Sequence, residues 1–455
     1  MGELMFDIGI IGAGPAGYTA AIRASQYGLK VVLFEKNEIG GTCLNRGCIP
    51  TKSLLHCVKI YSEVKNASKL GINSENISYD YSVISAKKND VVQKIRKSLT
   101  QLIESYGVEI VNAEAKIKDK NTIISQGNSY ECKNIIIATG SIPNNLDFKG
   151  DYSKNFILNS DDILSLDKLP DSILIVGSGA IGIEWARIFS ELDKKVSMVD
   201  IAQNLVPIAD VDVSNRIERI FKRKRIDYYL NTSIEMISGT NVLLSNQKQI
   251  NTDCILVAAG RSALKLNDDF CLKNVDMNKF IDADKNNKTS VVNIYAIGDV
   301  NGKSMLAHSA IHQALEAVEN IKNNIDSDFC PNLVPSVIYG SPEIAWIGFT
   351  EQKLVEQGIT YNKSLFPIAA LGKAHADNDI EGFVKILADD KKILGAHIVS
   401  NEASALIQQI AIAINNNISP ADIEKVIFAH PTYSEGIFEA ILGLKNMSLH
   451  LPQPK

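Results

Sequence analysis

The sequence predicts an α/β architecture, in which two related β-α-β units are followed by a smaller α+β domain. Residues 7–35 and 173–200 both run from a short apolar strand through a Gly-x-Gly-x-x-Gly turn into an amphipathic helix and a second apolar strand. In both units an acidic residue follows 23 positions after the first glycine. From about residue 330, the pattern changes to antiparallel strands, with helices expected near 402–416 and 420–427.

The composition excludes several classes of protein. The 455 residues are 45% hydrophobic and 22% charged, which is typical of globular proteins with large cores, and no apolar run is long enough to cross a bilayer. A net charge of -5 argues against nucleic acid as the main partner, and we interpret the basic run at 221–225 as a solvated helix face. No signal peptide is evident, and seven cysteines are ordinary usage, so we expect a cytoplasmic protein.

The two glycine turns predict binding of dinucleotides. The first glycine allows a tight turn, the second lets a pyrophosphate approach the backbone, and the third lets the helix pack closely on the sheet. The pyrophosphate lies at the positive helix end, and the closing acid accepts hydrogen bonds from a ribose. Asp200 would repel the extra phosphate of NADP, and no arginine follows it in 201–207, which favours NAD. The turns and acids are Gly12, Gly14, Gly17 and Glu35, then Gly177, Gly179, Gly182 and Asp200.

Each unit has a later apolar strand that ends in a glycine. Residues 134–141 and 254–261 suit buried parallel strands where the backbone meets a ligand. A third such segment, 293–300, ends in Gly298 and Asp299, and this carboxylate could hydrogen-bond a sugar-like chain. Between the units we expect a helix over 83–105 and short strands over 108–133.

Two cysteines, Cys43 and Cys48, lie five positions apart in "GGTCLNRGCIP", at residues 40–50. In a reducing compartment, a close pair is more often catalytic or metal-binding than structural, and a helix start would stabilise a thiolate. A structural disulfide is disfavoured by the compartment, and a zinc site by the lack of a second cysteine or histidine pair nearby. We expect the other cysteines to be buried or spare thiols: Cys57, Cys132, Cys254, Cys271 and Cys330.

Several motifs together carry a resemblance that covers essentially the whole chain. The run "GGTCLNRGCIPTK" (40–52), both glycine turns, "ATGS" (138–141), "AIGD" (296–299) and "HPTYSE" (430–435) resemble the class I FAD-dependent pyridine nucleotide disulfide oxidoreductases. The resemblance implies two Rossmann-like domains and a C-terminal α+β dimerisation domain. It implies an FAD-binding domain over 1–145 and 280–329, an NAD-binding domain over 146–279, and an interface domain over 330–455.

The resemblance also implies roles for individual residues. Cys43 would exchange with the substrate and Cys48 would face the flavin, while His430 would be the base and Glu435 would orient it. A homodimer would supply His430 and Glu435 from the partner chain. Lys52 would lie beside the flavin and pair with Glu184, which occupies the position of Thr19 in the first unit. Further cofactor contacts are implied for Glu35, Lys52, Thr139, Gly140, Asp299 and Ala307 with FAD, and for Gly260 with NAD.

The implied reaction is oxidation of protein-bound dihydrolipoamide with reduction of NAD+ to NADH. The lipoyl carrier would be a separate chain, either an E2 acyltransferase or a glycine-cleavage H protein. Related glutathione or mercuric reductases would be indicated by arginines after Asp200 or by a C-terminal cysteine pair, and the sequence has neither. A flavin-binding scaffold without turnover would need a broken cysteine or histidine site, and the expected catalytic residues are all present.

Some positions differ from the residues that are usual in the family that this sequence resembles. Arg46 adds a charge to the cysteine loop, Gly340 replaces a usual threonine, and Phe428 stands where many relatives carry a histidine. Residues 260–264 lack the usual Pro-Asn after Gly-Arg. His308 and His312 are spaced like metal ligands, but no acid motif or third ligand accompanies them, so we expect no metal.

Overall fold

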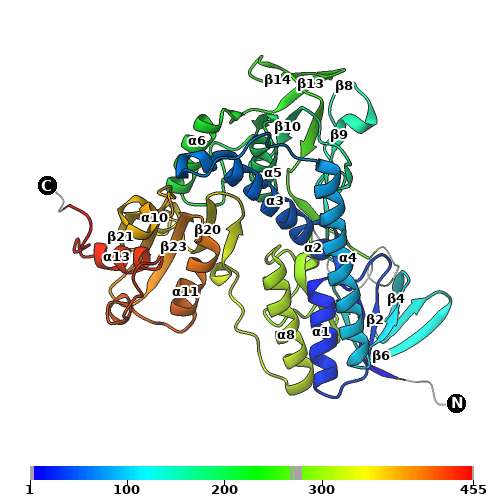
Figure 1. The fold of residues 1–455 in the computed structure, drawn as a ribbon. Helices are drawn as coiled ribbons and strands as arrows, with labels where there is room; N and C mark the ends of the chain where they lie inside the picture. The colour runs from blue at the N-terminus through cyan, green and yellow to red at the C-terminus, as the bar shows by residue number, and fades with distance from the viewer. Residues whose placement is uncertain (1–4, 267–269, 271–278, 453–455) are drawn as a thin grey trace.

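The computed structural model describes residues 5–266, 270 and 279–452. Two sheets with parallel centres and one antiparallel C-terminal sheet organise these residues, and helices pack against each of them (Figure 1). The predicted fold class is confirmed. None of the helices in the described part of the chain is both long and apolar enough to cross a membrane.

The first unit forms a sheet in the order β3-β2-β1-β6-β5-β4, and β18 returns to pair with β6. Helix α1 packs on α8, and α4 lies beside them (Figure 1). Small buried alanines such as Ala20 and Ala314 allow this close approach. The bounds are β1 Phe6–Ile11, α1 Pro15–Gln26, β2 Val31–Phe34, α4 Tyr81–Ser105, β3 Glu109–Val111, β4 Ala115–Asp119, β5 Thr122–Ser125, β6 Asn128–Ile137, β18 Ile294–Ala296 and α8 Ala307–Asn323.

The second unit repeats this plan in a sheet ordered β12-β11-β10-β16-β9. A small sheet, β15-β14-β13-β8, completes this part, and the pair β17-β7 joins it to the first unit. The bounds are β7 Ser141–Pro143, β8 Gly150–Asp151, β9 Ile157–Leu158, β10 Ser172–Val176, α5 Ala180–Glu191, β11 Lys195–Val199, α6 Val211–Lys224, β12 Asp227–Tyr229, β13 Ile234–Ser238, β14 Asn241–Leu244, β15 Gln249–Asn251, β16 Cys254–Val257 and β17 Arg261–Ala263.

The C-terminal sheet, β19-β20-β23-β22-β21, is antiparallel and buried on both faces. Side chains such as Ile398 pack under α11 and α13, whereas Val399 points to the core that contains α5. The sheet is therefore attached to the second unit. The bounds are β19 Ser336–Ile338, β20 Glu343–Gly348, α9 Glu351–Glu356, β21 Asn362–Pro367, α10 Gly372–Ala376, β22 Phe383–Ala388, β23 Ile393–Ser400, α11 Ala403–Asn415, α12 Pro420–Ile423 and α13 Glu435–Gly443.

Two local expectations need correction, and one helix was not predicted. The helix expected over 420–427 ends at Ile423, and the unpredicted helix, α13, begins at Glu435 within the "HPTYSEG" segment. The basic run at 221–225 is only partly a solvated face, because Phe221 is 1% exposed and belongs to the core under α6. Phe221 belongs to the apolar stripe of α6 with Ile217 and Ile220, which are also buried.

Helices α2 (Gly41–Arg46) and α3 (Cys48–Asn66) lie in the centre of the molecule (Figure 1). Because α3 packs against both α4 and α5, it bridges the first and second units. The single-turn helices are η1 Ala67–Leu70, η2 Lys154–Phe156, η3 Ile163–Ser165, η4 Gly298–Asn301, η5 Pro331–Leu333 and η6 Ile368–Ala370.

Candidate active site

The first and third glycines of each turn are required by close backbone contacts. Gly12 has φ +102°, and a Cβ there would lie 2.4 Å from the Ala138 carbonyl oxygen. A Cβ on Gly17 would lie 1.8 Å from the Gly12 carbonyl oxygen. Larger residues are therefore excluded, and the helix lies close to the sheet. The second unit repeats both contacts at Gly177 and Gly182.

The second glycines leave the helix starts open. No side chain caps α1 at Gly14 or α5 at Gly179, and neither first turn contains an acid. A Cβ on Gly179 would meet no described atom within 4 Å. Free N–H groups at an accessible helix start are the donors that a pyrophosphate needs. Both turns thus fit the phosphates of a dinucleotide.

The closing acids are held beside these turns by backbone amides. The Ala13 N–H donates to Glu35 Oε2 at 2.8 Å, and the Ser178 N–H donates to Asp200 Oδ2 at 2.6 Å. Each carboxylate oxygen has further lone pairs. Glu35 and Asp200 are consequently oriented to accept hydrogen bonds from a ribose near each glycine turn.

Asp299 lies in η4, after β18, within a polar cluster that the sequence only partly indicated. Ser141 Oγ donates to Asp299 Oδ2 at 2.5 Å, and Arg261 Nε donates to Ser141 Oγ at 2.8 Å. Burial raises the pKa of Asp299, although Ser141 and Arg261 oppose the shift. Ser141 and Arg261 were missed because their role depends on strands β7 and β17 pairing across the two units. The glycines before them, Gly140 and Gly260, have φ of +75° and +88°.

Two other predicted cofactor residues lie at chain turns of the first unit. Thr139 Oγ1 donates to the carbonyl oxygen of Leu264, which ties the end of β6 to the segment after β17. Ala307 is the first residue of α8, whose N-terminus has no side-chain cap. This open helix start presents backbone N–H groups suited to an acidic or carbonyl group of a cofactor.

The cysteine pair is brought against the first glycine turn. A Cβ on Gly41 would lie 2.6 Å from the Gly14 Cα atom, so only glycine permits this approach of α2. Cys43 lies in α2, and Cys48 is the first residue of the 19-residue α3. Both are free thiols, and each changes the acidity of the other.

The two thiols have opposite acidities. The hydrogen bond from Cys43 and the ammonium of Lys52 lower the pKa of Cys48 to about 7, against the effect of burial. The pKa of Cys43 is raised, because this thiol donates the shared hydrogen bond and is itself buried. Cys48 is therefore the thiolate of the reduced pair near neutral pH.

An ion pair between the two units lies next to Cys48. Lys52 Nζ is 2.9 Å from Glu184 Oε1 and 3.0 Å from Oε2, and Glu184 also accepts the Tyr339 N–H at 3.0 Å. Burial lowers the pKa of Lys52, but Glu184 outweighs it, and the net shift is upward. The alternative of an exposed surface pair is excluded for Glu184, whose side chain is 7% exposed.

His430 and Glu435 form a second, separate pair. His430 Nδ1 lies 2.8 Å from Glu435 Oε1, and the Thr432 N–H donates to Glu435 Oε2 at 2.8 Å. The imidazole is 76% exposed, and α13 lies apart from α2 and α3 within one chain (Figure 1). One chain therefore brings together Cys43, Cys48, Lys52 and Glu184, and does not bring His430 to them.

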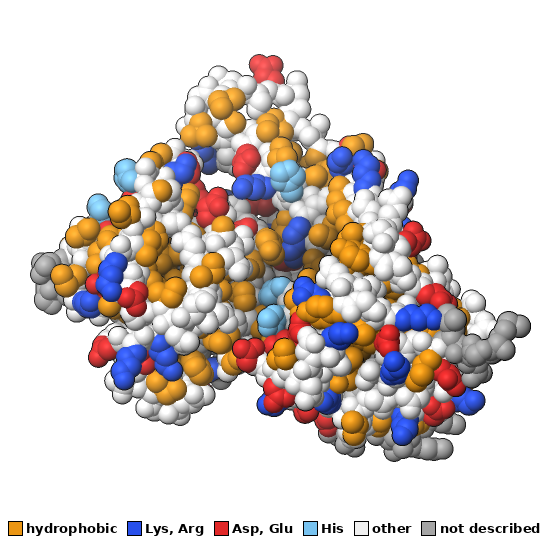
Figure 2. Space-filling model, turned by 90° about the horizontal axis from the view of Figure 1, so that it is seen from below, with side chains coloured by type: hydrophobic (Ala, Val, Ile, Leu, Met, Phe, Trp, Pro, Cys, Tyr) orange, Lys and Arg blue, Asp and Glu red, His pale blue; other side chains and the backbone are white. Residues whose placement is uncertain are grey.

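The molecule seen from below has a hollow near the middle of this face, and charged and histidine side chains lie around the hollow (Figure 2).

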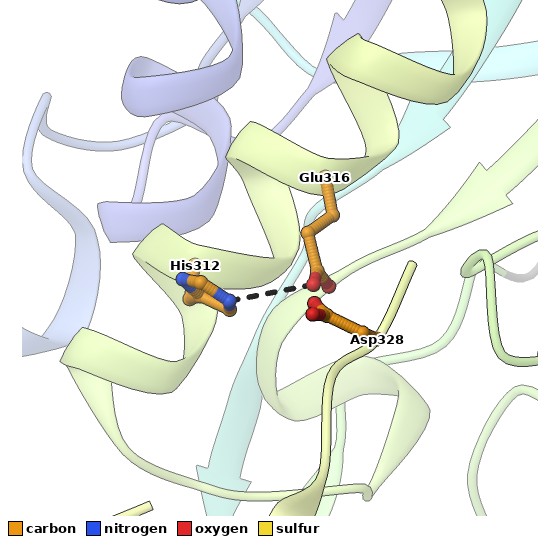
Figure 3. A group of neighbouring side chains, drawn as sticks. All are labelled: His312, Glu316 and Asp328. Carbon is orange, nitrogen blue, oxygen red and sulfur yellow. Dashed lines mark ion pairs between the residues drawn. The ribbon is translucent and has the colours of Figure 1, made fainter. Parts of the chain in front are cut away.

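The two histidines considered as metal ligands do not act together. His308 Nε2 lies 2.7 Å from the Pro335 carbonyl oxygen. His312 instead meets Glu316, with Nε2 3.3 Å from Oε1, and Asp328 lies beside them (Figure 3). The other oxygen of Glu316 accepts a hydrogen bond from Ser327 at 2.6 Å. The expectation that no third ligand accompanies these histidines is therefore wrong for His312, because His312, Glu316 and Asp328 form a group that could hold a metal ion.

A second acidic group surrounds an internal cation. Asp210, Asp212 and Glu351 converge on Lys385 Nζ at 2.8, 2.6 and 2.6 Å. Lys385 is 1% exposed and comes from the C-terminal sheet, whereas Asp210 and Asp212 lie at the start of α6. This ammonium occupies the position that a metal ion would take.

The remaining described cysteines differ from the central pair. Burial raises the pKa of Cys132 and of Cys254 to about 12, which leaves these thiols protonated and unreactive. Cys57 is partly buried on α3 and Cys330 is exposed. Cys271 lies outside the described residues.

Two family models match this chain. Residues 6–314 match the pyridine nucleotide-disulphide oxidoreductases, and residues 334–441 match the dimerisation domain of the same family. The chain therefore belongs to the pyridine nucleotide-disulphide oxidoreductase family, and its C-terminal domain pairs it with a second copy. The predicted family, enzyme class and cofactors, FAD and NAD, are confirmed.

Within this family, the chain is similar to dihydrolipoyl dehydrogenases along nearly its whole length. It is 36% identical to the enzyme of Chlamydia muridarum, with 98% of each chain covered, and 32% identical to that of Bacillus subtilis, with 98% and 99% covered. The enzyme of Buchnera aphidicola is 38% identical, with 96% and 94% covered.

Solved structures share the fold. LpdA from Mycobacterium tuberculosis matches with a TM-score of 0.88 at 23% identity, over 96% of this chain and 99% of that one. The HOCl-induced flavoprotein disulfide reductase RclA from Escherichia coli, in its Cu(II) complex, matches with a TM-score of 0.84 at 25% identity, over 98% and 99%.

Proposed function

We propose that this protein oxidises protein-bound dihydrolipoamide to lipoamide and reduces NAD+ to NADH. The observation that carries the proposal is the Cys43 and Cys48 pair at the start of α3, beside Lys52 and Glu184 and between two open glycine turns. Dihydrolipoyl dehydrogenases that cover nearly the whole chain support the choice of substrate.

The first unit is assigned to FAD and the second to NAD. Gly12, Gly14 and Gly17 would hold the FAD pyrophosphate, with Glu35 at the ribose and Lys52, Thr139, Gly140, Asp299 and Ala307 along the rest of the molecule. Gly177, Gly179, Gly182 and Asp200 would hold NAD, with Gly260 near its nicotinamide. FAD, when bound, supplies the two-electron carrier between the thiol pair and NAD+. In this proposal the FAD-binding domain spans 1–145 and 280–329, the NAD-binding domain spans 146–279, and the interface domain spans 330–455.

The thiol pair performs the exchange with substrate. One substrate thiolate attacks Cys43 in the Cys43–Cys48 disulfide, which forms a mixed disulfide and releases Cys48 as a thiolate. The second substrate sulfur then displaces Cys43, and lipoamide leaves. The reduced pair holds the two electrons that NAD+ finally accepts, so that one dihydrolipoamide and one NAD+ give one lipoamide, one NADH and one proton. The pKa of about 7 suits Cys48 as the leaving thiolate.

The base comes from the second copy in this proposal. His430 of the partner subunit would take the substrate thiol proton, while Glu435 of the partner subunit holds the ring through Nδ1. The 76% exposure of the imidazole and its 2.8 Å contact to Glu435 support an oriented base presented to a neighbouring chain. We further propose a cytoplasmic enzyme whose lipoyl carrier is a separate E2 acyltransferase or glycine-cleavage H protein.

The deciding experiment follows NADH formation after purified protein is mixed with dihydrolipoamide and NAD+ or NADP+. We expect NAD-specific turnover that Cys48→Ser abolishes. Cys57→Ser, on the same helix but outside the pair, is the matched control and should keep turnover. A protein that retains FAD without any turnover of dihydrolipoamide would exclude this substrate.

A further inference from the structure

Arg187 is a buried cation that the proposed reaction leaves without a role. It lies on α5, one turn after Glu184, and is 3% exposed. Its Nη1 donates to the Pro342 carbonyl oxygen, while Nε and Nη2 have no hydrogen-bond partner among the described residues. Burying a guanidinium with unpaired N–H donors costs free energy, so we looked for a function that a buried arginine could serve at this position.

The segment 339–342 is attached to α5 at both ends. Tyr339 donates its N–H to Glu184 at 3.0 Å, and Pro342 accepts from Arg187. The Tyr339 ring also lies under the Lys52 ammonium, with Nζ 4.7 Å from the ring centroid. The Lys52–Glu184 pair thus contacts this segment through both of its members, and Arg187 contacts the other end of the segment.

Gly340 is the counterpart of Arg187. It has φ +144°, and a Cβ there would lie 2.3 Å from Arg187 Nη1 and 2.4 Å from Arg187 Cδ. A threonine, expected at this position from the resemblance, would collide with the guanidinium. The departure at Gly340 thus has a structural explanation, because glycine leaves the space that the arginine fills.

We propose that Arg187 is a positioning residue, which holds residues 339–342 against α5 and thereby keeps Glu184 and Lys52 in place beside Cys48. The inference rests on the proposed role of the Lys52–Glu184 pair. The acidic groups whose charges act on Arg187 are Glu191, Glu184 and Glu343. The charged and titratable groups that act on or respond to Cys48 are Cys43, Lys52, Glu184, Tyr18, Tyr339 and Arg261.

The test is the pH profile of Cys48 alkylation in the reduced holoenzyme, measured with iodoacetamide and peptide-resolved mass spectrometry. Arg187→Met should raise the midpoint by about one pH unit. Two effects raise the pKa of Cys48. The positive charge of Arg187 is lost. In addition, Glu184 loses the hydrogen bond from the Tyr339 N–H and then neutralises the charge of Lys52 more fully. Arg216→Met is the matched control, because Arg216 also joins the second unit to the C-terminal domain, through Glu381 at 2.8 Å. It should leave the midpoint unchanged.

A double variant distinguishes positioning from general damage. Gly340→Thr alone should displace the guanidinium and raise the midpoint as Arg187→Met does, which also provides a test if Arg187→Met does not fold. In an Arg187→Ala background, where no side-chain atom extends beyond Cβ, Gly340→Thr should shift the midpoint less than it does in the wild type, since the collision is gone and only the backbone strain at φ +144° remains. An unchanged midpoint in both single variants, or additive shifts in the double variant, overturns the inference. If the midpoint moves but wild-type protein does not turn over dihydrolipoamide, the proposed substrate fails and the positioning role stands.

Discussion

Lys52 and Glu184 meet from opposite units of the chain, with Nζ 2.9 Å from Oε1, and they meet beside Cys48. Lys52 lies one turn into α3, and Glu184 one turn into α5. Lys52 lowers the pKa of Cys48, while Glu184 raises it. The thiolate therefore depends on the balance of this pair.

Removing the carboxylate should make Cys48 more acidic. Glu184→Gln eliminates the negative charge that raises the thiol pKa, so we expect the alkylation midpoint to fall below about 7 by up to about one pH unit. This direction is opposite to that of Arg187→Met. Glu191→Gln on the same helix serves as the control, and a midpoint that rises in Glu184→Gln would contradict the charge balance.

If His430 acts on the cysteine pair of the partner subunit, as proposed, two inactive dimers should complement each other. Cys48→Ser and His430→Gln should each lower turnover, the latter by roughly 10²–10⁴-fold for loss of a general base. After subunit exchange, hybrid dimers contain one site with an intact cysteine pair and an intact histidine, so activity should reappear. Recovery should be absent if each chain uses its own His430. His375→Gln, at another exposed histidine of the C-terminal domain, should retain activity.

Asp200 should control the choice of nucleotide. Its side chain accepts from the Ser178 and Ala202 N–H groups at 2.6 and 2.9 Å and faces the proposed ribose site. Asp200→Ala removes a charged hydrogen-bond acceptor, so the KM for NAD+ should rise roughly tenfold. Discrimination against NADP+ should decrease, while FAD content stays unchanged. Glu35→Ala should instead reduce the retention of FAD. Equal effects of the two variants on the KM for NAD+ would argue against assigning FAD to the first unit and NAD to the second.

The buried Lys385 should hold the C-terminal sheet to the second unit. Lys385→Met leaves Asp210 without its cation in a site where both side chains are almost fully buried, so unfolding should become easier by about 3–5 kcal/mol. Denaturant titration measures this change. Lys363→Met is the matched control, because Lys363 contacts the same Glu351 at 2.7 Å but is 61% exposed. This variant should lower the free energy of unfolding by about 1 kcal/mol or less.

The same network gives stability a defined pH dependence. Burial raises the pKa of Asp210, but His397, Lys385 and backbone amides outweigh it, and the folded-state pKa is lowered. Ionised Asp210 therefore contributes fully to the stability of the fold above its unfolded-state pKa of about 3.9. This contribution is lost as the pH falls through the lower pKa of the folded state. Thermal melting of Asp210→Asn should show a weaker dependence on pH in this acidic range than wild type.

Local patterns were sufficient for much of the fold. The glycine spacing predicted both turns, the apolar runs predicted β1, β2, β10 and β11, and amphipathic spacing predicted a helix over 83–105 that forms as α4. The missed helix α13 and the shorter α12 lie after 416, where short helices depend on packing against the antiparallel sheet more than on their own periodicity.

The sequence by itself determined which chemical groups are present: two glycine turns typical of dinucleotide binding, a close pair of cysteines at a helix start, and a histidine followed by a glutamate. Only the tertiary structure decided how these groups act on one another. It placed Glu184 against Lys52, joined Ser141, Arg261 and Asp299, fitted Arg187 over Gly340, and left His430 exposed and apart from the cysteines. The physical reason is that these contacts join residues distant in the chain, so they depend on how helices and sheets pack, which local spacing does not encode.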